Sequence, residues 1–222
     1  MPAPELPVQL YGLERSVYTR IARLALEEKG VPYALQEVEI FGPAGVPAEH
    51  VVRHPFGRIP VLRHGGFMLY ETASITRYVD EAFDGPPLQP ATPGERARMN
   101  QIVGLLDAYA YRPLVWGVFV ERISAPRSGR APDEARIADA LPSCERALAA
   151  LTALTTPDQP LLLGPSPTLA DLHLFPMLRY FALTPDGRAM LARFTRLDEW
   201  LKRMDLRPSV EGTRSVYERT EA

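Results

Sequence analysis

Residues 54–75 constrain the fold most strongly, because they combine a proline-started strand, a glycine turn and a strand-to-helix junction. Ile59-Pro60 opens a short apolar run, and the start of a strand is one of the few sheet positions that proline tolerates. Residues 64–66 (His-Gly-Gly) predict a hairpin turn, and Glu71-Thr72 marks where the second strand gives way to a helix. The first residues of a helix expose N–H groups that attract anions. The segment therefore predicts a free backbone edge beside a site for an anion such as a carboxylate.

The preceding residues add two strands and a helix to this segment. Residues 8–11 and 33–40 read as strands, and the apolar positions of residues 17–29 recur at helical spacing. Ser16 is placed to cap the amino end of that helix. A helix between two strands implies that they pair in parallel, whereas the glycine turn implies an antiparallel pair. A mixed four-stranded sheet with helices on its faces satisfies both conditions.

Strand patterns stop after a linker rich in proline and glycine at residues 85–94. The rest of the chain has helical patterns, including a long first helix that Pro113 should kink. Thr168 and Asp171 have the spacing of a capping box at the start of a later helix. We therefore predict a β-α-β-β-α domain over residues 1–84, the linker, and an all-helical domain over residues 95–222.

Composition excludes several classes of function. The chain has 222 residues and a formal net charge of −2, which gives no electrostatic reason to expect nucleic acid or an anionic membrane as a partner. One cysteine, Cys144, cannot form an internal disulfide or a cysteine-based zinc site. His50 and His54 are four residues apart, but no third ligand completes a metal set. No signal peptide or membrane-spanning run is recognisable, so we expect a cytoplasmic protein without a metal.

Five motifs, in this order and spacing, resemble those of the glutathione transferases, and the resemblance covers residues 7–205. The thioredoxin-like half followed by a helical half is also the layout of that family. The closest resemblance is to the serine-using classes, phi, theta and their bacterial relatives. The motifs are Leu10-Tyr11-Gly12 before a helix that starts at a serine, Ala25-Leu26-Glu27-Glu28-Lys29-Gly30, His54-Pro55-Phe56-Gly57-Arg58-Ile59-Pro60, Leu69-Tyr70-Glu71-Thr72 and Thr168-Leu169-Ala170-Asp171.

The resemblance implies that Ser16 is catalytic and stabilises the thiolate of glutathione, a cosubstrate. A thiol with a pKa near ~8.5 is only a few per cent ionised at pH 7, and the thiolate is the nucleophile. Lowering that pKa by about two units requires about 2.7 kcal/mol of differential stabilisation. A hydroxyl at a helix amino end can supply much of this. The alternative is that Ser16 only caps the helix, and Tyr11 is a possible rival inside the strand.

The resemblance also assigns glutathione-binding roles. A cis Ile59-Pro60 bond would present the Ile59 backbone to the cysteinyl part, as in strand addition. Thr72 would hold the γ-glutamyl carboxylate and Glu71 the amino group, the alternative being a simple strand-to-helix junction. Residues 44–47 lack the basic pair that grips the glycine carboxylate in plant-type members. Arg58, which replaces a common glutamine, would bind glutathione, and the carboxylate partner stays open among four candidates: Arg53, His54, Arg58 and Arg112.

The helical half would supply the pocket for a hydrophobic electrophile. The resemblance places Tyr109, Arg112 and Trp116 in its wall, and the alternative is that they only pack between helices. Phe56 matches the position of a phenylalanine that locks the dimer in some classes, which predicts a homodimer. The alternative is that Phe56 anchors its own chain.

Two functions follow from these residues. The first is an enzyme in which the glutathione thiolate attacks a small electrophile, with isomerase, dehalogenase and peroxidase chemistry built from the same parts. The second is a non-catalytic binding or assembly module, which the missing basic pair would fit. A thiol oxidoreductase is disfavoured because Cys144 does not stand at a helix start.

Overall fold

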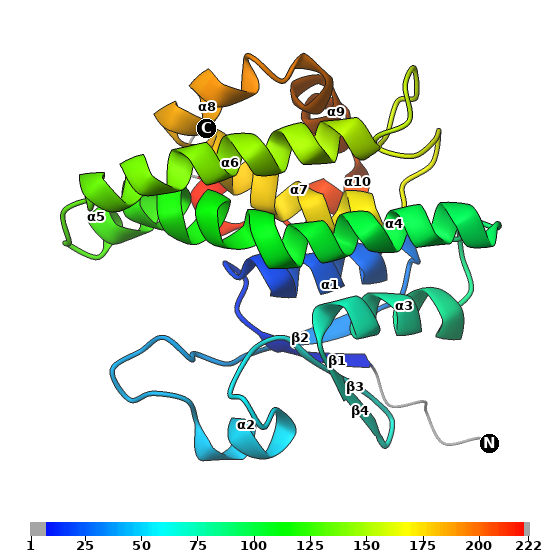
Figure 1. Ribbon diagram of the computed structural model, residues 1–222. Helices are drawn as coiled ribbons and strands as arrows, with labels where there is room; N and C mark the ends of the chain where they lie inside the picture. Colours follow the sequence, from blue (N-terminus) through cyan, green and yellow to red (C-terminus); the bar gives the residue numbers. More distant parts are fainter. Residues whose placement is uncertain (1–7, 220–222) are drawn as a thin grey trace. The chain divides into compact units, whose positions relative to one another are not determined.

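The computed structural model of the chain describes residues 8–219 (Figure 1). These residues form two compact units. The first unit contains the described residues up to Leu88 together with those from Pro208 onward, and the second unit spans Gln89–Arg207.

The first unit is built on a mixed four-stranded sheet with the strand order β2-β1-β3-β4. Strand β1 pairs in parallel with β2 and antiparallel with β3, and β3 pairs antiparallel with β4. The mixed sheet predicted from the sequence is therefore confirmed. The elements are β1 (Val8–Gly12), α1 (Val17–Glu28), β2 (Tyr33–Glu37), α2 (Ala48–Arg53), β3 (Val61–His64), β4 (Phe67–Tyr70) and α3 (Thr72–Ala82).

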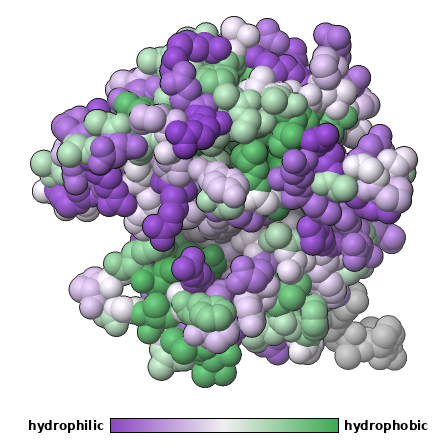
Figure 2. All heavy atoms as spheres, in the orientation of Figure 1, coloured by the Kyte–Doolittle hydropathy of each residue, from purple (hydrophilic) through white to green (hydrophobic). Residues whose placement is uncertain are grey.

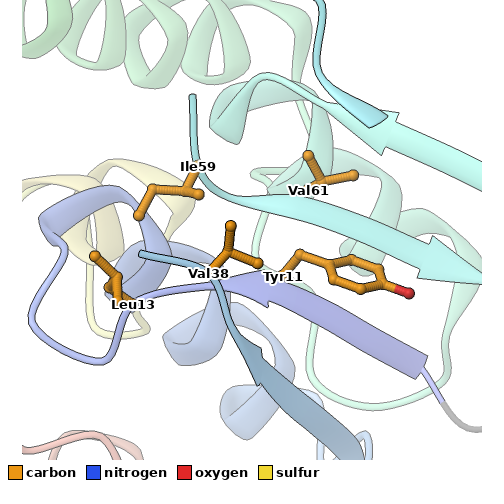
Figure 3. Close-up of a cluster of buried hydrophobic side chains, with 5 residues drawn as sticks. All are labelled: Tyr11, Leu13, Val38, Ile59 and Val61. Carbon is orange, nitrogen blue, oxygen red and sulfur yellow. The ribbon is translucent and has the colours of Figure 1, made fainter. Parts of the chain in front are cut away.

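The sheet register brings three chain segments to one end of the sheet. Val61 at the start of β3 pairs with Tyr11 near the end of β1 and with Tyr70 at the end of β4. A buried apolar cluster fills this end and fixes the segments against one another (Figure 3). Its members are Tyr11, Leu13, Val38, Ile59 and Val61.

Lys29, which follows α1, ties the end of the first unit to that helix. Its Nζ atom donates hydrogen bonds to the Asp80 carbonyl oxygen at 3.1 Å, to Asp80 Oδ1 at 3.2 Å and to the Pro86 carbonyl oxygen at 3.3 Å. Asp80 Oδ1 also accepts a hydrogen bond from the backbone N–H of Leu88 at 2.8 Å, and Leu88 is buried. The first four residues of the predicted linker are thus fixed to the sheet domain.

The second unit is all helical over its described residues. Helix α7 lies at its centre, since nearly every side chain on it is buried. The all-helical half predicted from the sequence is confirmed. The elements are α4 (Pro93–Leu105), η1 (Leu106–Ala110), η2 (Arg112–Ser124), α5 (Ala125–Arg127), α6 (Glu134–Leu154), α7 (Leu169–Ala182), α8 (Pro185–Leu191) and α9 (Thr195–Asp205).

The helix around Pro113 has a winding that the sequence did not predict. Residues 106–124 wind mostly as π-helix, and the N–H of Tyr111 donates to the carbonyl oxygen of Leu106, five residues earlier. The N–H of Ala125 donates to Val120 in the same way. Pro113 has no N–H to donate, and the wider hydrogen-bond spacing distributes the disturbance over several turns.

The domain boundary after residue 207 also differs from the prediction, which assigned residues 95–222 to the helical domain. Helices α10 (Pro208–Gly212) and α11 (Val216–Arg219) belong to the first unit. The physical reason is a buried ion pair, in which Arg20 on α1 binds Glu218 on α11. An amphipathic pattern shows that a segment buries one face, but it does not show which domain that face contacts.

Candidate functional site

Ser16 lies at the sheet end described above and caps α1, as the sequence predicts. Its Oγ atom accepts a hydrogen bond from the backbone N–H of Thr19 at 3.3 Å, and its own N–H donates to the Leu13 carbonyl oxygen at 3.0 Å. The side chain is half-buried. Because Oγ acts as an acceptor toward the helix, the hydroxyl hydrogen remains available to donate to a ligand. The geometry permits both the capping role and a donor role.

Tyr11 is a weaker candidate for the donor role than Ser16. Its hydroxyl donates to Gln9 Oε1 at 2.8 Å. The guanidinium of Arg53 lies over its ring, 4.4 Å from the centroid. Both the hydroxyl and the ring face of Tyr11 therefore have partners within the protein.

Ile59 and Pro60 join through a cis peptide bond, as the family resemblance implies. Both residues are buried. The Arg58 carbonyl oxygen, just before them, accepts a hydrogen bond from Nε2 of His50 at 2.7 Å. His50 is fully buried on α2 and fixes the backbone that leads into β3. Sequence reasoning considered His50 only as a metal ligand and missed this contact, because nothing in the pattern links a histidine to a carbonyl eight residues later.

Glu71 and Thr72 form the junction between β4 and α3. Glu71 has a φ of 70°, in the left-handed region that few residues other than glycine adopt. Such a conformation costs about 1–3 kcal/mol and tends to occur at functional sites. The Glu71 side chain is exposed, whereas Thr72 is buried at the first position of the helix. The sheet register brings this junction beside Ile59-Pro60, because Tyr70 and Val61 are partners.

Three residues of the first unit are candidate partners for the glycine carboxylate of glutathione, and they differ in burial and in charge. His54 is buried, and its Nδ1 atom accepts a hydrogen bond from the N–H of Phe56 at 3.2 Å. Burial lowers the pKa of His54 below its ordinary value, although the negative charge of Glu71 opposes this shift. His54 is therefore neutral at pH 7. Arg53 is half-buried against Tyr11, whereas the Arg58 side chain is exposed.

The three residues predicted to wall an electrophile pocket lie on one π-helical run of the second unit. Tyr109 is 70% exposed and Arg112 is exposed. Trp116 is half-buried, and its Nε1 atom donates to the hydroxyl of Tyr111 at 2.9 Å. The structure therefore puts these residues on the same helical segment, with two of them open to solvent in the chain.

Large hydrophobic side chains are exposed around α2 of the first unit. Phe56, just after α2, is 73% exposed, and Val52 on α2 is 87% exposed, with Val51 beside it and Phe41 in the preceding loop also exposed. In Figure 2, which has the orientation of Figure 1, hydrophobic surface gathers at the lower left, where Figure 1 labels α2. Phe56 therefore does not serve as an anchor inside its own chain.

Residues 8–219 contain neither a metal-binding cluster nor a membrane-spanning helix. No set of three or more histidine, cysteine, aspartate or glutamate side chains in this part of the chain is arranged to hold a metal ion. None of the helices described for these residues combines the length and the apolar character that crossing a bilayer requires.

Comparison with known protein families gives two matches that together cover most of the chain. Residues 10–87 match the N-terminal domain of glutathione S-transferases. Residues 133–203 match the C-terminal domain of the same proteins. Among curated proteins, glutathione S-transferase 4 of Zea mays is 29% identical over 203 residues, which cover 91% of this chain and 89% of the relative.

Solved structures agree with this match. The structure of glutathione S-transferase III in its apo form is 26% identical, with a TM-score of 0.81 over 94% of this chain and 95% of that one. The maize glutathione S-transferase I in complex with an atrazine glutathione conjugate is also 26% identical. Its TM-score is 0.79, over 94% of this chain and 96% of that one.

Proposed function

Because the chain belongs to the glutathione S-transferase family, we propose that it is a transferase that joins the sulfur of glutathione to small electrophilic molecules. The observation that carries this proposal is the Ser16 hydroxyl. It caps α1 as an acceptor and keeps its hydrogen free, at the sheet end where Ile59-Pro60 and the Glu71 junction also lie. The solved relative that holds a glutathione conjugate supports this assignment.

In the proposed reaction, Ser16 donates a hydrogen bond to the glutathione sulfur and lowers the pKa of the thiol. The proton leaves to solvent, and the thiolate forms a bond to the electrophilic carbon. A leaving group, where the substrate has one, departs with the bonding electron pair. The protein contributes positioning and stabilisation of the anion, with no covalent bond between itself and the substrate.

The geometry of the first unit supports the glutathione contacts that the family resemblance implies. The Ile59 backbone at the cis bond pairs with the cysteinyl residue, and Thr72 at the start of α3 receives the γ-glutamyl carboxylate. The exposed Glu71 carboxylate binds the amino group. Its left-handed backbone supports this role, since a strained residue requires a compensating purpose. Tyr109, Arg112 and Trp116 are the proposed contacts for the electrophile.

We assign Arg58 to the glycine carboxylate of glutathione. Among the candidate cations of the first unit, it is the exposed one, and its carbonyl oxygen is fixed by His50 next to Ile59. His54 is neutral at pH 7, and Arg53 lies against Tyr11. Arg112 belongs to the second unit and is kept for the electrophile pocket.

A non-catalytic binding module is the second candidate, because residues 44–47 carry no basic side chain. Calorimetric titration with glutathione, combined with a conjugation assay, tests both. We expect wild-type protein to bind glutathione with a Kd on the order of 1 mM or tighter and to conjugate it to a dinitrohalobenzene. Binding of glutathione without conjugation would favour the non-catalytic module. If glutathione produced no heat of binding, both the transferase and the binding module would be contradicted.

The same titration tests Arg58. Arg58→Gln should weaken glutathione binding about fivefold to tenfold, because a charge-assisted hydrogen bond to the carboxylate is lost. Arg63→Gln is the matched control. Arg63 lies farther along β3, where its Nε atom donates to the Gly65 carbonyl oxygen, so its loss should leave the Kd within about twofold. Equal effects of the two changes would contradict the assignment of Arg58.

We further propose that the protein is a cytoplasmic homodimer that uses the apolar area around α2. An area of this kind on a folded surface is typical of a protein interface, and Phe56 protrudes from it. Reduced thiols such as glutathione are maintained in the cytosol.

Sedimentation measures the predicted dimer. Wild-type protein should sediment as a dimer, and Phe56→Glu should weaken dimerisation by about 30-fold or more, because it puts a charge at a buried anchor. Leu206→Glu, at an 85% exposed residue of the second unit, should leave the dimer unchanged. A monomeric wild-type protein would contradict the proposal.

A further inference from the structure

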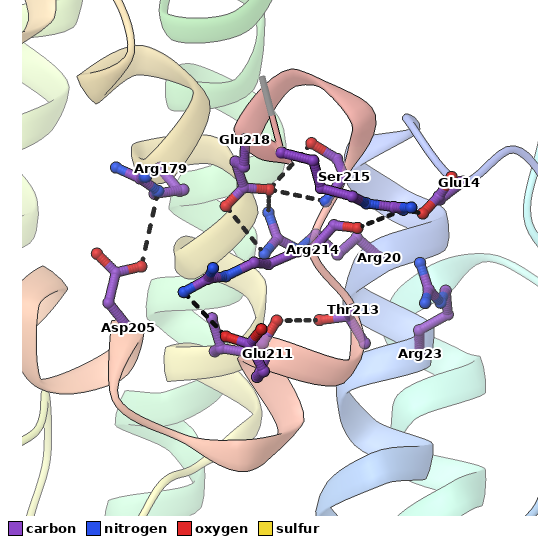
Figure 4. Close-up of polar contacts among 12 residues, drawn as sticks. Glu14, Arg20, Arg23, Arg179, Asp205, Glu211, Thr213, Arg214, Ser215 and Glu218 are labelled. Carbon is purple, nitrogen blue, oxygen red and sulfur yellow. Dashed lines mark hydrogen bonds and ion pairs between the residues drawn. The ribbon is translucent and has the colours of Figure 1, made fainter. Parts of the chain in front are cut away.

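Residues 208–219 pack against α1, the helix that Ser16 caps. Four polar contacts connect the two segments, and they follow α1 from its carboxyl end toward its start. They are Ser209 Oγ to Glu28 Oε1, Arg23 Nη2 to the Gly212 carbonyl oxygen at 3.0 Å, the Arg20–Glu218 ion pair, and the Arg219–Glu14 ion pair. Figure 4 draws the contact between Arg20 and Glu218. We call residues 208–219 the returning segment.

The Arg20–Glu218 ion pair is the buried contact in this row. The Arg20 side chain is 0% exposed and the Glu218 side chain is 3% exposed. Their hydrogen bonds are bidentate, with distances of 2.6 Å and 3.2 Å. Glu218 Oε2 also accepts hydrogen bonds from the N–H and the hydroxyl of Ser215, both at 2.9 Å. Burial raises the pKa of Glu218, but Arg20 and these hydrogen bonds outweigh it and hold the pKa below its ordinary value.

Arg20 is also part of the turn that orients Ser16. Its backbone N–H donates to the Ser16 carbonyl oxygen at 2.9 Å, and the N–H of Thr19, one residue earlier, donates to Ser16 Oγ. The first turn of a helix lacks half of its internal hydrogen bonds and frays easily. The buried ion pair with Glu218 opposes this fraying, because Arg20 is the residue whose N–H closes the turn on the Ser16 carbonyl oxygen.

We propose that the returning segment is a positioning element for Ser16, acting through the Arg20–Glu218 pair. By holding the Arg20 side chain in one place, Glu218 fixes the first turn of α1 and thereby the direction of the Ser16 hydroxyl. This inference rests on the proposed function. Glu218 is a positioning residue and does not itself contact glutathione in the proposed reaction.

Two physical effects of removing Glu218 have opposite signs, and this makes the proposal testable. Loss of the negative charge of Glu218 would by itself favour the thiolate and lower the pKa of bound glutathione. A displaced Ser16 hydroxyl would withdraw its hydrogen bond and raise that pKa. If Glu218 acts by positioning Ser16, its removal should therefore raise the thiol pKa of bound glutathione. If Glu218 acts only through its charge, its removal should lower that pKa.

The experiment measures the thiol pKa of bound glutathione from the ultraviolet difference absorbance of the thiolate, in the full-length protein. In Glu218→Ala we expect this pKa to rise by about one unit and kcat at neutral pH to fall about tenfold. The KM for glutathione should change less than about threefold, because Ile59, Glu71 and Thr72 remain. Glu211→Gln, which removes an exposed ion pair to Arg214 on the same segment, should match wild type.

A double variant covers the case in which Glu218→Ala does not fold. Replacing both charges by apolar residues, Arg20→Met with Glu218→Leu, removes the buried charge and keeps a packed anchor. It should fold and show a thiol pKa within about half a unit of wild type. An unchanged or lowered pKa in Glu218→Ala, or a double variant that folds with a pKa raised by about one unit or more, would overturn the inference. Absence of any thiolate signal in wild type would instead overturn the proposed function.

Discussion

Replacing Ser16 with alanine should lower kcat/KM for glutathione conjugation by about 100-fold at neutral pH. The change removes the hydroxyl hydrogen of Ser16, which Oγ can donate to a ligand while it accepts from the Thr19 N–H. Loss of a single donor to a developing or stable anion in an active site costs about 10²–10³-fold in rate. The thiol pKa of bound glutathione should rise, so the rate should recover as the pH is raised. Steady-state kinetics over a range of pH measure this directly.

Two further variants separate the donor role of Ser16 from its capping role. Ser16→Asp keeps an oxygen that can accept from the Thr19 N–H, so α1 should remain capped. It offers no donor to the sulfur and adds a negative charge, so conjugation should be lost although the fold is kept. Tyr11→Phe should retain activity within about threefold, because the Tyr11 hydroxyl is engaged by Gln9. A full loss in Tyr11→Phe together with an active Ser16→Ala would show that Tyr11 is the donor.

Replacing Asp171 with alanine should destabilise the second unit by about 5 kcal/mol or more, which is comparable to the whole stability of many domains. The Asp171 carboxylate is fully buried and accepts four hydrogen bonds. Burial raises its pKa, and the hydrogen bonds oppose that rise. The donors are the N–H of Leu162, the N–H and hydroxyl of Thr168, and Nε1 of Trp200, at distances of 2.8–3.0 Å. Alanine leaves all of these groups buried without a partner.

Tryptophan fluorescence during denaturant unfolding measures this loss. The chain has two tryptophans, Trp116 and Trp200, and both belong to the second unit, so their signal reports on that unit. Glu199→Ala is the control. It removes an exposed pair with Arg203 on α9 and should change stability by less than about 0.5 kcal/mol. A fully folded Asp171→Ala protein with wild-type stability would show that the carboxylate is dispensable.

The sequence predicted those parts of the fold that depend on local rules. The capping box at Thr168 and Asp171, the Ser16 cap and the mixed sheet follow from residue type and spacing, and the structure confirms them. The π-helical run over residues 106–124 was not predictable. A proline in the sequence shows that one N–H donor is missing, but it does not show how the neighbouring backbone hydrogen bonds rearrange. The return of residues 208–219 to the first unit depends on long-range packing, which periodicity does not encode.

The candidate site was predictable in its position but not in its supporting contacts. The family resemblance brought Ser16, Ile59 and Glu71 to one site, and the strand register places them at the same end of the sheet. The left-handed backbone of Glu71 carries no sequence signal, because glutamate rarely adopts this conformation and no glycine or asparagine marks the position. The hydrogen bond from His50 to the Arg58 carbonyl oxygen is equally hidden, because it depends on how α2 is folded against the following loop.

The first unit is formed by two stretches of chain that are far apart in the sequence, and this affects its folding during translation. Residues 8–88 leave the ribosome early, but Glu218, which neutralises Arg20 in the finished unit, is synthesised only after all of residues 89–207. Domains commonly fold one after another as they emerge from the ribosome. Here the nascent sheet domain lacks Glu218, the buried ion-pair partner of Arg20, until the helical domain has been translated, so translation order alone delays completion of the sulfur-binding half.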